Sequence, residues 1–280
     1  MHEPSTPSEH DERGERAELI EQLAARWATM TPPIRPSRED QARFARALDD
    51  APLPRDARVL LLGSTPELRS MVLERGHRLT GCDIDDLFWH AMARLRTTDG
   101  PETFIHGNWL DLVEGHYDLV LGDCAFNMLG WDDMGRLVPK IAALLDRGGR
   151  AIFRIQARNP DHDLRTLEDA IADFPAERTG QAFLVAHHFL VESLRSTLHP
   201  EMTNRQFYEA VVSRFLSPEQ LQRLLPLTRD KRNFYPEMSA LQALLRRDFE
   251  IAHQQPCPSP GAWDTAHLFV LVPRADKTEG

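Results

Sequence analysis

A glycine and an aspartate, 20 residues apart, are the residues whose types and spacing point most directly to chemistry. Gly63 follows an apolar run over 58–62, and Asp83 ends a second such run. A glycine after a buried strand lets the backbone approach a ligand closely, and a following helix offers unpaired N–H groups. A carboxylate at the tip of the neighbouring strand can accept hydrogen bonds from ribose hydroxyls. The spacing therefore predicts a nucleotide-binding half-unit.

The segments around these two residues alternate between strand and helix patterns. Strands are expected over 58–62, 78–83, 103–106, 117–122, 151–156, 249–254 and 267–272. Helices are expected between them over 66–75, 87–96 and 132–145, the last closed by the glycines of RGG. This β/α rhythm indicates a Rossmann-like α/β fold with a mostly parallel sheet. The last two strands form a closing hairpin, which makes the last strand antiparallel.

The chain divides into five segments by composition and pattern. They are a disordered tail over 1–15, an N-terminal helical cap over 16–56, a nucleotide-binding core over 57–160, a helical insertion over 161–247 that covers the substrate, and closing strands with a tail over 248–280. In the cap, Ser37 with Asp40 three residues later is an acidic variant of the capping box. In the insertion, helices are expected near 164–173, 204–215, 217–225 and 237–247, and Ser217 followed by Pro218 marks one of their starts.

Composition and charge favour a small-molecule partner. The net charge is −10, and no basic run supplies the positive field that nucleic-acid binding needs. No apolar run approaches the roughly 18 residues that span a bilayer, and the N-terminus lacks the pattern of a secretory signal. The three cysteines form no C-x-x-C pair, so neither a zinc site nor a disulfide framework is expected. The cytoplasm is the expected location.

The turn after the first strand bears on which nucleotide is bound. It reads G-S-T-P-E and lacks the second and third glycines of the dinucleotide fingerprint. Glu67 would repel a pyrophosphate at the start of the following helix. A ligand with adenine, ribose and a zwitterionic amino-acid tail suits the turn better, because Ser64 and Thr65 can bond the tail and Glu67 can attract its ammonium.

Over 58–156 the chain resembles the class I S-adenosylmethionine-dependent methyltransferases. LLLGSTPEL is similar to a divergent first motif of that family, with Thr65 where a second glycine is usual, and GCDID is similar to the second motif. HGNWLDL resembles the adenine-contacting segment, YDLVLGDCAFNML the fourth motif and LLDRGGRAIFRI the fifth-strand segment. The leading PPIRPSREDQ resembles N-terminal segments that cover the cofactor in some small-molecule members.

The resemblance implies S-adenosylmethionine as cofactor and a set of contacts to it. Asp83 would bind the ribose hydroxyls, Asn108 the adenine edge and Trp109 the adenine face. Asp123 would contact the cofactor's amino group, orient the substrate or cap the next segment. The full set of implied cofactor contacts is Gly63, Ser64, Thr65, Asp83, Ile84, Asn108, Trp109, Asp123 and Cys124.

Methyl transfer requires no universal catalytic residue, because the sulfonium leaving group is already activated. The catalytic residue is therefore left unknown, with His187, His188 and Tyr235 as candidates and Glu237 as a further pocket-lining residue. DCAF also resembles the D/N-P-P-Y/F pattern of amino-group methyltransferases, but it lacks the prolines. No spacing supports a metal site.

Three functions remain open at this point. The first is methyl transfer from S-adenosylmethionine to an oxygen or nitrogen of a small metabolite. The second is an NAD(P)-dependent oxidoreductase, and the third is a non-catalytic methyltransferase-like binding module, which the divergent first motif supports. The substrate and the assembly are not determined by these patterns, and a homodimer is one option for the assembly.

Overall fold

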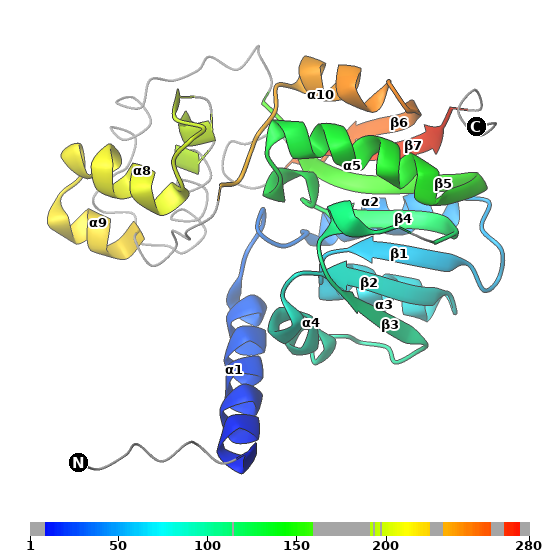
Figure 1. The fold of residues 1–280 in the computed structure, drawn as a ribbon, viewed down its shortest axis with the longest axis horizontal. Coiled ribbons are helices and arrows are strands. Elements are labelled where there is room, and N and C mark those ends of the chain that lie inside the picture. Colours follow the sequence, from blue (N-terminus) through cyan, green and yellow to red (C-terminus); the bar gives the residue numbers. More distant parts are fainter. Residues whose placement is uncertain are drawn as a thin grey trace.

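The architecture is taken from a computed structural model. The residues that the structure describes are 9–113, 115–158, 191–192, 194–196, 198–224, 232–258 and 266–274. They form one seven-stranded sheet with helices on both faces (Figure 1). In these parts of the chain, every helix is too short or too polar to span a bilayer.

The sheet has the strand order β3-β2-β1-β4-β5-β7-β6. The strands are β1 (Arg58–Leu62), β2 (Arg78–Asp83), β3 (Glu102–His106), β4 (Tyr117–Asp123), β5 (Leu145–Gln156), β6 (Phe249–Pro256) and β7 (Ala266–Pro273). The pairs among β1 to β5 are parallel, whereas β7 is antiparallel to both of its neighbours. The predicted Rossmann-like sheet with an antiparallel last strand is confirmed.

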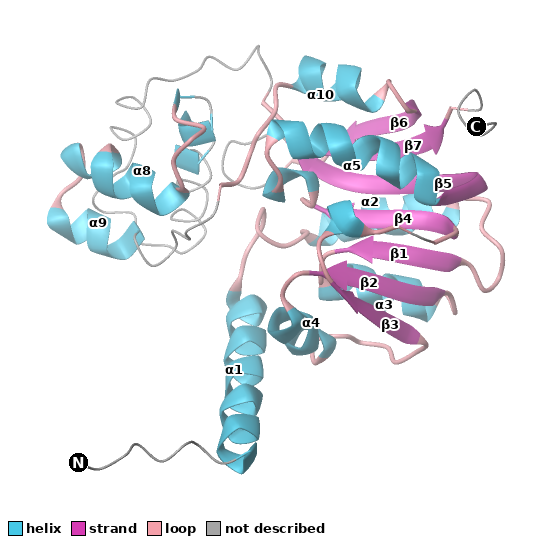
Figure 2. Cartoon of the chain, viewed as in Figure 1, coloured by secondary structure: helices cyan, strands magenta, loops and turns pink. Residues whose placement is uncertain are grey.

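Helices cover both faces of this sheet (Figure 2). The α-helices are α1 (Glu9–Thr29), α2 (Arg38–Asp49), α3 (Pro66–Glu74), α4 (Asp86–Ala93), α5 (Trp131–Leu144), α8 (Asn204–Ala210), α9 (Pro218–Leu224) and α10 (Met238–Leu245). Short 3-10 turns, η1 (Trp109–Asp111), η2 (Phe126–Met128) and η3 (Val212–Arg214), complete the elements. Helices α5 and α10 lie on one face, and α2 and α3 lie on the other.

The apolar run of β1 explains why both faces are covered. Successive side chains of a strand point to opposite faces. Leu60 and Leu62 pack in the core that contains α5 and α10, whereas Val59 and Leu61 pack in the core that contains α2 and α3. All four are buried, as is typical of a parallel strand that lies between two helical layers.

The N-terminal helix begins earlier than predicted. Residues 9–15, which were expected to belong to a disordered tail, are helical as part of α1, and residues 1–8 lie outside the described part of the chain. The glutamates and the arginine of this stretch favour helix formation. Further along, α1 packs against α4, where the rings of Trp27 and Phe88 lie 5.7 Å apart.

The end of α5 also differs from the prediction. The helix ends at Leu144, and β5 begins at the next residue rather than after a glycine turn. Gly148 has a φ of +87° within β5, and the pairing of β5 with β4 shifts register between Tyr117 and Leu119. The glycines of RGG therefore allow an irregular stretch of strand, because the left-handed conformation costs glycine little.

The insertion contributes α8 and α9, which lie beyond the carboxyl ends of the parallel strands (Figure 1). The single helix expected over 204–215 is divided into α8 and η3. The helix expected near 164–173 lies outside the described residues. Phe207, Tyr208 and Val212 form a small apolar cluster of their own with Val191 and Leu216, so this part of the insertion has its own core.

Gly81 in β2 gives a prediction about stability. A Cβ at this position would lie 2.0 Å from the ring of Trp89. That ring cannot move easily, because it stacks on Phe104 at 4.8 Å and lies 3.6 Å from the guanidinium of Arg69. Gly81→Ala is therefore expected to destabilise the protein by about 1–3 kcal/mol in chemical denaturation.

Gly135 provides the matched control for this change. It lies within α5, and a Cβ there would meet no atom within 4 Å. Gly135→Ala is expected to stabilise the protein by about 0.5–1 kcal/mol, since alanine is the better helix former. Equal unfolding free energies for the two variants would contradict the packing around Trp89.

Candidate functional site

The carboxyl edge of the parallel strands brings together residues that are distant in the sequence. Leu62 of β1 pairs with Cys82 of β2 on one side and with Gly122 of β4 on the other. The residue after each of these is a predicted contact: Gly63, Asp83 and Asp123. Neighbouring parallel strands thus place all three along one edge, which is where ligands bind in open α/β sheets.

Gly63 forms a tight turn against Trp109. Its φ is +102°, a conformation that side-chain-bearing residues rarely adopt. The N–H of Gly63 donates to the carbonyl of Cys82 at 2.9 Å, and the indole Nε1 of Trp109 donates to the same carbonyl at 2.7 Å. A Cβ at Gly63 would lie 4.0 Å from the Trp109 ring. The structure therefore brings these two predicted contacts together.

Hydrogen bonds from Ser64 and Asp85 help to hold the Asp83 carboxylate. The hydroxyl of Ser64 donates to Oδ2 at 2.6 Å, and the backbone N–H of Asp85 donates to Oδ1 at 3.1 Å. Ser64 is buried, and Asp83 is half-buried at the end of β2. Ser64 was expected to bond the tail of the ligand, but in this structure its hydroxyl orients Asp83. Sequence reasoning missed this hydrogen bond because it joins the turn after β1 to the end of β2 and depends on the orientation of the Ser64 side chain.

Two further predicted cofactor contacts, Ile84 and Asn108, lie along the same edge. Ile84 is 68% exposed, and its carbonyl bonds the Nε2 of His106 at 3.0 Å. The side chain of Asn108 accepts from the N–H of Leu110 at 3.0 Å, so it caps the turn η1 that begins with Trp109. An exposed apolar side chain at a strand tip offers a surface for a flat ring. The roles of Ile84 and Asn108 in ligand binding stay predictions.

Asp123 is held by an arginine that sequence reasoning did not single out. Arg154 of β5 is fully buried and donates to both carboxylate oxygens of Asp123, at 2.5 and 3.1 Å. Arg154 also donates to Asp40 of α2 at 3.2 Å. The only sequence signal was a charged residue inside the apolar strand AIFRIQ. Asp123 therefore belongs to a buried ion-pair cluster, and a direct contact with a ligand stays a prediction.

Charge and burial set the protonation of this cluster. Burial lowers the pKa of Arg154, but the charges of Asp123 and Asp40 outweigh burial and raise the pKa above its usual value. Arg154 therefore remains charged. Burial raises the pKa of the Cys124 thiol to about 12, so Cys124 is a neutral thiol near pH 7 and not an activated nucleophile.

Among the candidate catalytic residues, Tyr235 is described, whereas His187 and His188 lie outside the described residues. The hydroxyl of Tyr235 donates to the buried Glu192 at 2.9 Å. Burial, followed by the charge of Glu192, raises the pKa of Tyr235 well above 10. Tyr235 therefore stays a phenol and acts as a hydrogen-bond donor, not as a phenolate base. Its catalytic role remains a prediction.

Sequence reasoning missed the polar cluster around Glu192. This carboxylate also accepts hydrogen bonds from the amides of Asn204 and Asn233. The neighbouring residue Phe234 is fixed to the sheet edge, because its N–H donates to the carbonyl of Asn127 at 2.9 Å. Asn127 in turn donates to the carbonyl of Phe234 at 2.9 Å. The insertion is thereby attached to the turn that follows β4.

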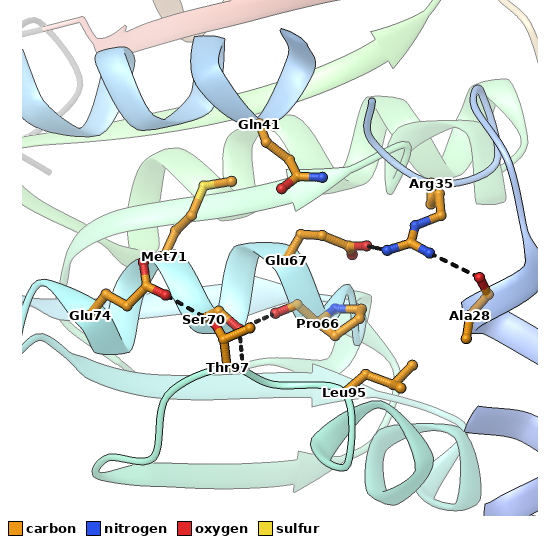
Figure 3. Close-up of a pocket in the computed structure, with 10 residues that line it drawn as sticks. All are labelled: Ala28, Arg35, Gln41, Pro66, Glu67, Ser70, Met71, Glu74, Leu95 and Thr97. Atoms are coloured by element: carbon orange, nitrogen blue, oxygen red, sulfur yellow. Dashed lines mark hydrogen bonds and ion pairs between the residues drawn. The ribbon is translucent and has the colours of Figure 1, made fainter. Parts of the chain in front are cut away.

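A cavity of about 300 Å³ lies beside α3, and none of the nine predicted cofactor contacts lines it (Figure 3). Glu67, Ser70 and Glu74 of α3 line it together with Arg35 and Thr97. The Nη2 of Arg35 bonds Oε1 of Glu67 at 2.5 Å. Glu67, expected to attract the ammonium of a ligand, thus already has a cationic partner from its own chain, and its role toward a ligand stays a prediction.

No family model and no curated protein matches this chain. Among solved structures, a Rhodobacter sphaeroides protein provisionally described as a zinc-dependent alcohol dehydrogenase is similar with a TM-score of 0.59 and 17% identity, covering 93% of this chain and 98% of that chain. In the described residues, no group of three or more His, Cys, Asp or Glu side chains is arranged to hold a metal ion.

Two methyltransferases are also similar. The N-methyltransferase NodS from Bradyrhizobium japonicum, in complex with S-adenosylhomocysteine, matches with a TM-score of 0.53 and 11% identity over 90% of this chain and 97% of that chain. The Burkholderia thailandensis 1,6-didemethyltoxoflavin-N1-methyltransferase matches with a TM-score of 0.51 and 16% identity, covering 97% of this chain and 92% of that chain. At these identities the likeness concerns the fold. The chain has the fold of the class I S-adenosylmethionine-dependent methyltransferases.

Proposed function

We propose that this protein binds S-adenosylmethionine at the carboxyl edge of its sheet and transfers the methyl group to an oxygen or nitrogen of a small metabolite. The observation that carries the proposal is the arrangement of Gly63, Asp83 and Trp109. The glycine turn provides close backbone approach, the oriented carboxylate provides an acceptor for ribose hydroxyls, and the indole lies beside the turn.

Methyl transfer depends more on the position of the acceptor atom than on proton transfer. The sulfonium of S-adenosylmethionine supplies a methyl carbon with an activated leaving group. The residues of this chain would align the acceptor lone pair with that carbon and exclude water. Where the acceptor carries a proton, a base must remove it. Tyr235 does not provide a phenolate, because the pKa of its hydroxyl is raised.

The acceptor is expected on the side of the edge that the insertion covers. Helices α8 and α9 lie beyond the carboxyl ends of the strands (Figure 1), and Tyr235 with Glu192 forms a buried polar cluster in this region. Two of the similar methyltransferases are named as acting on nitrogen. A small polar metabolite with a nitrogen or oxygen nucleophile is consistent with both observations.

An NAD-dependent oxidoreductase is the second candidate, because one similar structure is described as an alcohol dehydrogenase. In the doubly wound dinucleotide fold the sixth strand follows the fifth directly. In this chain the antiparallel β7 lies between β5 and β6. The turn at Gly63 also lacks the three-glycine fingerprint. Both differences favour methyl transfer.

Calorimetric titration of the full chain distinguishes the candidate functions. S-adenosylhomocysteine is expected to bind with a dissociation constant of roughly micromolar order, and NADH is expected to give no heat of binding. Binding of NADH without binding of S-adenosylhomocysteine would reverse the assignment. Binding of S-adenosylhomocysteine without turnover across a panel of small amines, phenols and hydroxyl compounds would favour the non-catalytic module.

A further inference from the structure

The segment over 33–43, which comprises the end of the α1–α2 connection and the first turns of α2, is attached to the strand tips by a buried arginine. The Nη2 of Arg154 donates to the carbonyl of Pro33 at 3.0 Å, and its Nη1 donates to Asp40 at 3.2 Å. Arg154 and Asp40 are both 0% exposed. Two points of the segment, seven residues apart, therefore bind one side chain of β5.

The same guanidinium holds the tip of the neighbouring strand. Its Nε and Nη2 form two bonds to the carboxylate of Asp123, whose side chain is 2% exposed. Such a paired, charge-assisted contact fixes geometry as well as charge. Arg154 therefore joins β4, β5 and the N-terminal segment at one point of the carboxyl edge.

Asp40 is itself held from several directions. Its Oδ2 accepts from the N–H of Ser37 at 3.0 Å, and its Oδ1 lies 3.4 Å from Arg43. The capping box of α2 thus points one carboxylate inward, toward Arg154. Two arginines and two aspartates balance one another in the cluster. If the segment lifted, Arg154 and Asp123 would keep their charges in a buried place with fewer partners, which is costly.

A second ion pair attaches the segment near the glycine turn. Arg35 bonds Glu67 in the first turn of α3 and donates to the carbonyl of Ala28 at 3.4 Å (Figure 3). Glu67 is four residues from Gly63. The segment is thus fastened beside both the β1–α3 turn and the tips of β4 and β5.

We infer that Arg154 is a positioning residue that holds the segment over 33–43 as a fixed wall of the cofactor site. The segment is in place before any ligand arrives, and it is not a lid that orders on binding. The inference rests on the proposed function for the identity of the ligand, but the attachment of the segment itself does not depend on it.

Hydrogen–deuterium exchange of the unliganded protein tests the fixed wall directly. Amides of the segment are expected to exchange slowly without ligand, and S-adenosylhomocysteine is expected to change their rates by less than about twofold, because a state already populated gains little from the ligand. Fast exchange in the unliganded protein that becomes slow with S-adenosylhomocysteine would show a lid and overturn the inference.

Arg154→Met and Arg69→Met form the matched pair of variants. Arg69 is also 0% exposed, but its side chain bonds Glu102 and the carbonyl of Trp89, both outside the segment. Only Arg154→Met is expected to accelerate exchange over 33–43. If about one-tenth of the Arg154→Met molecules keep the segment over 33–43 in place, the dissociation constant of S-adenosylhomocysteine for this variant rises about tenfold. Equal local exchange in the two variants would overturn the inference, whatever their thermal stability.

Asp40→Asn keeps the inference testable if Arg154→Met does not fold. It retains the volume of the side chain and removes the charge that faces Arg154, and it is expected to accelerate exchange over the same segment. Exchange as slow as in the wild type would contradict the inference. If the wild type binds no S-adenosylhomocysteine but the segment still depends on Arg154, the proposed function fails and the attachment stands.

Discussion

Asp83→Asn is expected to weaken binding of S-adenosylhomocysteine by about 100-fold, equivalent to roughly 2.7 kcal/mol. The carboxylate is oriented by Ser64 and by the N–H of Asp85 at the tip of β2. An asparagine would present an amide donor where the ribose hydroxyls need an acceptor, and it would lose the charge that strengthens both bonds. Titration calorimetry measures the change.

Asp118→Asn is the control for this prediction. Asp118 lies near the start of β4, at the amino ends of the parallel strands. Its carboxylate accepts a hydrogen bond from the N–H of Arg58 at 2.7 Å. An asparagine oxygen can still accept this bond. Binding should therefore stay within about twofold of the wild type. A loss of affinity shared equally by the two variants would mean that Asp83 does not contact the nucleoside.

Gly63→Ala is expected to abolish measurable binding, a loss of more than about 100-fold. The φ of +102° is strained for any residue with a Cβ, so the turn must move or store about 1–3 kcal/mol. A methyl group on the turn would also project between the backbone and a ligand that approaches it. Calorimetry with S-adenosylhomocysteine and thermal unfolding together measure both effects.

Gly76→Ala is the control that separates the effect of backbone strain on stability from the effect of a turn substitution on ligand binding. Gly76 has a φ of +74°, and a Cβ there would meet no atom within 4 Å. It follows the end of α3, away from the carboxyl edge. This variant is expected to lose about 1–2 kcal/mol of stability and to retain binding. Retained binding of S-adenosylhomocysteine in Gly63→Ala, or an equal loss of binding in the two variants, would show that the turn is not part of the binding site.

The sequence was sufficient for the sheet and for the placement of its functional edge. Parallel strands buried on both faces read as continuous apolar runs, so the ends of β1, β2 and β4 could be predicted to within one residue. The chain then places the residue after each run at the same edge. Gly63 and Asp83 were found for this reason, and Trp109 followed from its motif.

The contacts among those residues could not be predicted in the same way. Arg154 and Asp40 are 114 residues apart, and their ion pair depends on how α2 packs beneath the carboxyl edge. Asp123 was therefore predicted to contact the cofactor, orient the substrate or cap the next segment, and its pairing with Arg154 through both oxygens was not foreseen. The bond between Ser64 and Asp83 likewise depends on one rotamer. Local sequence patterns do not encode such long-range pairings.

The insertion was the least predictable part of the chain. Its helix over 204–215 is broken because Val211 leaves the regular helix geometry, with a φ of −114°. The cluster around Glu192 joins residues from three separate stretches, and no spacing in the sequence indicates it. Tyr235 was singled out as an aromatic residue, but its partner could be identified only from the structure.

A crystal structure of the protein with S-adenosylhomocysteine tests the central claim most directly. Ribose hydroxyls are expected within hydrogen-bond distance of Asp83, the ligand against the backbone of Gly63 and the adenine beside Trp109. The segment over 33–43 should keep its bonds to Arg154. Density for the nucleoside elsewhere on the molecule, or a β1–α3 turn closed by side chains with no nucleoside bound, would contradict the account.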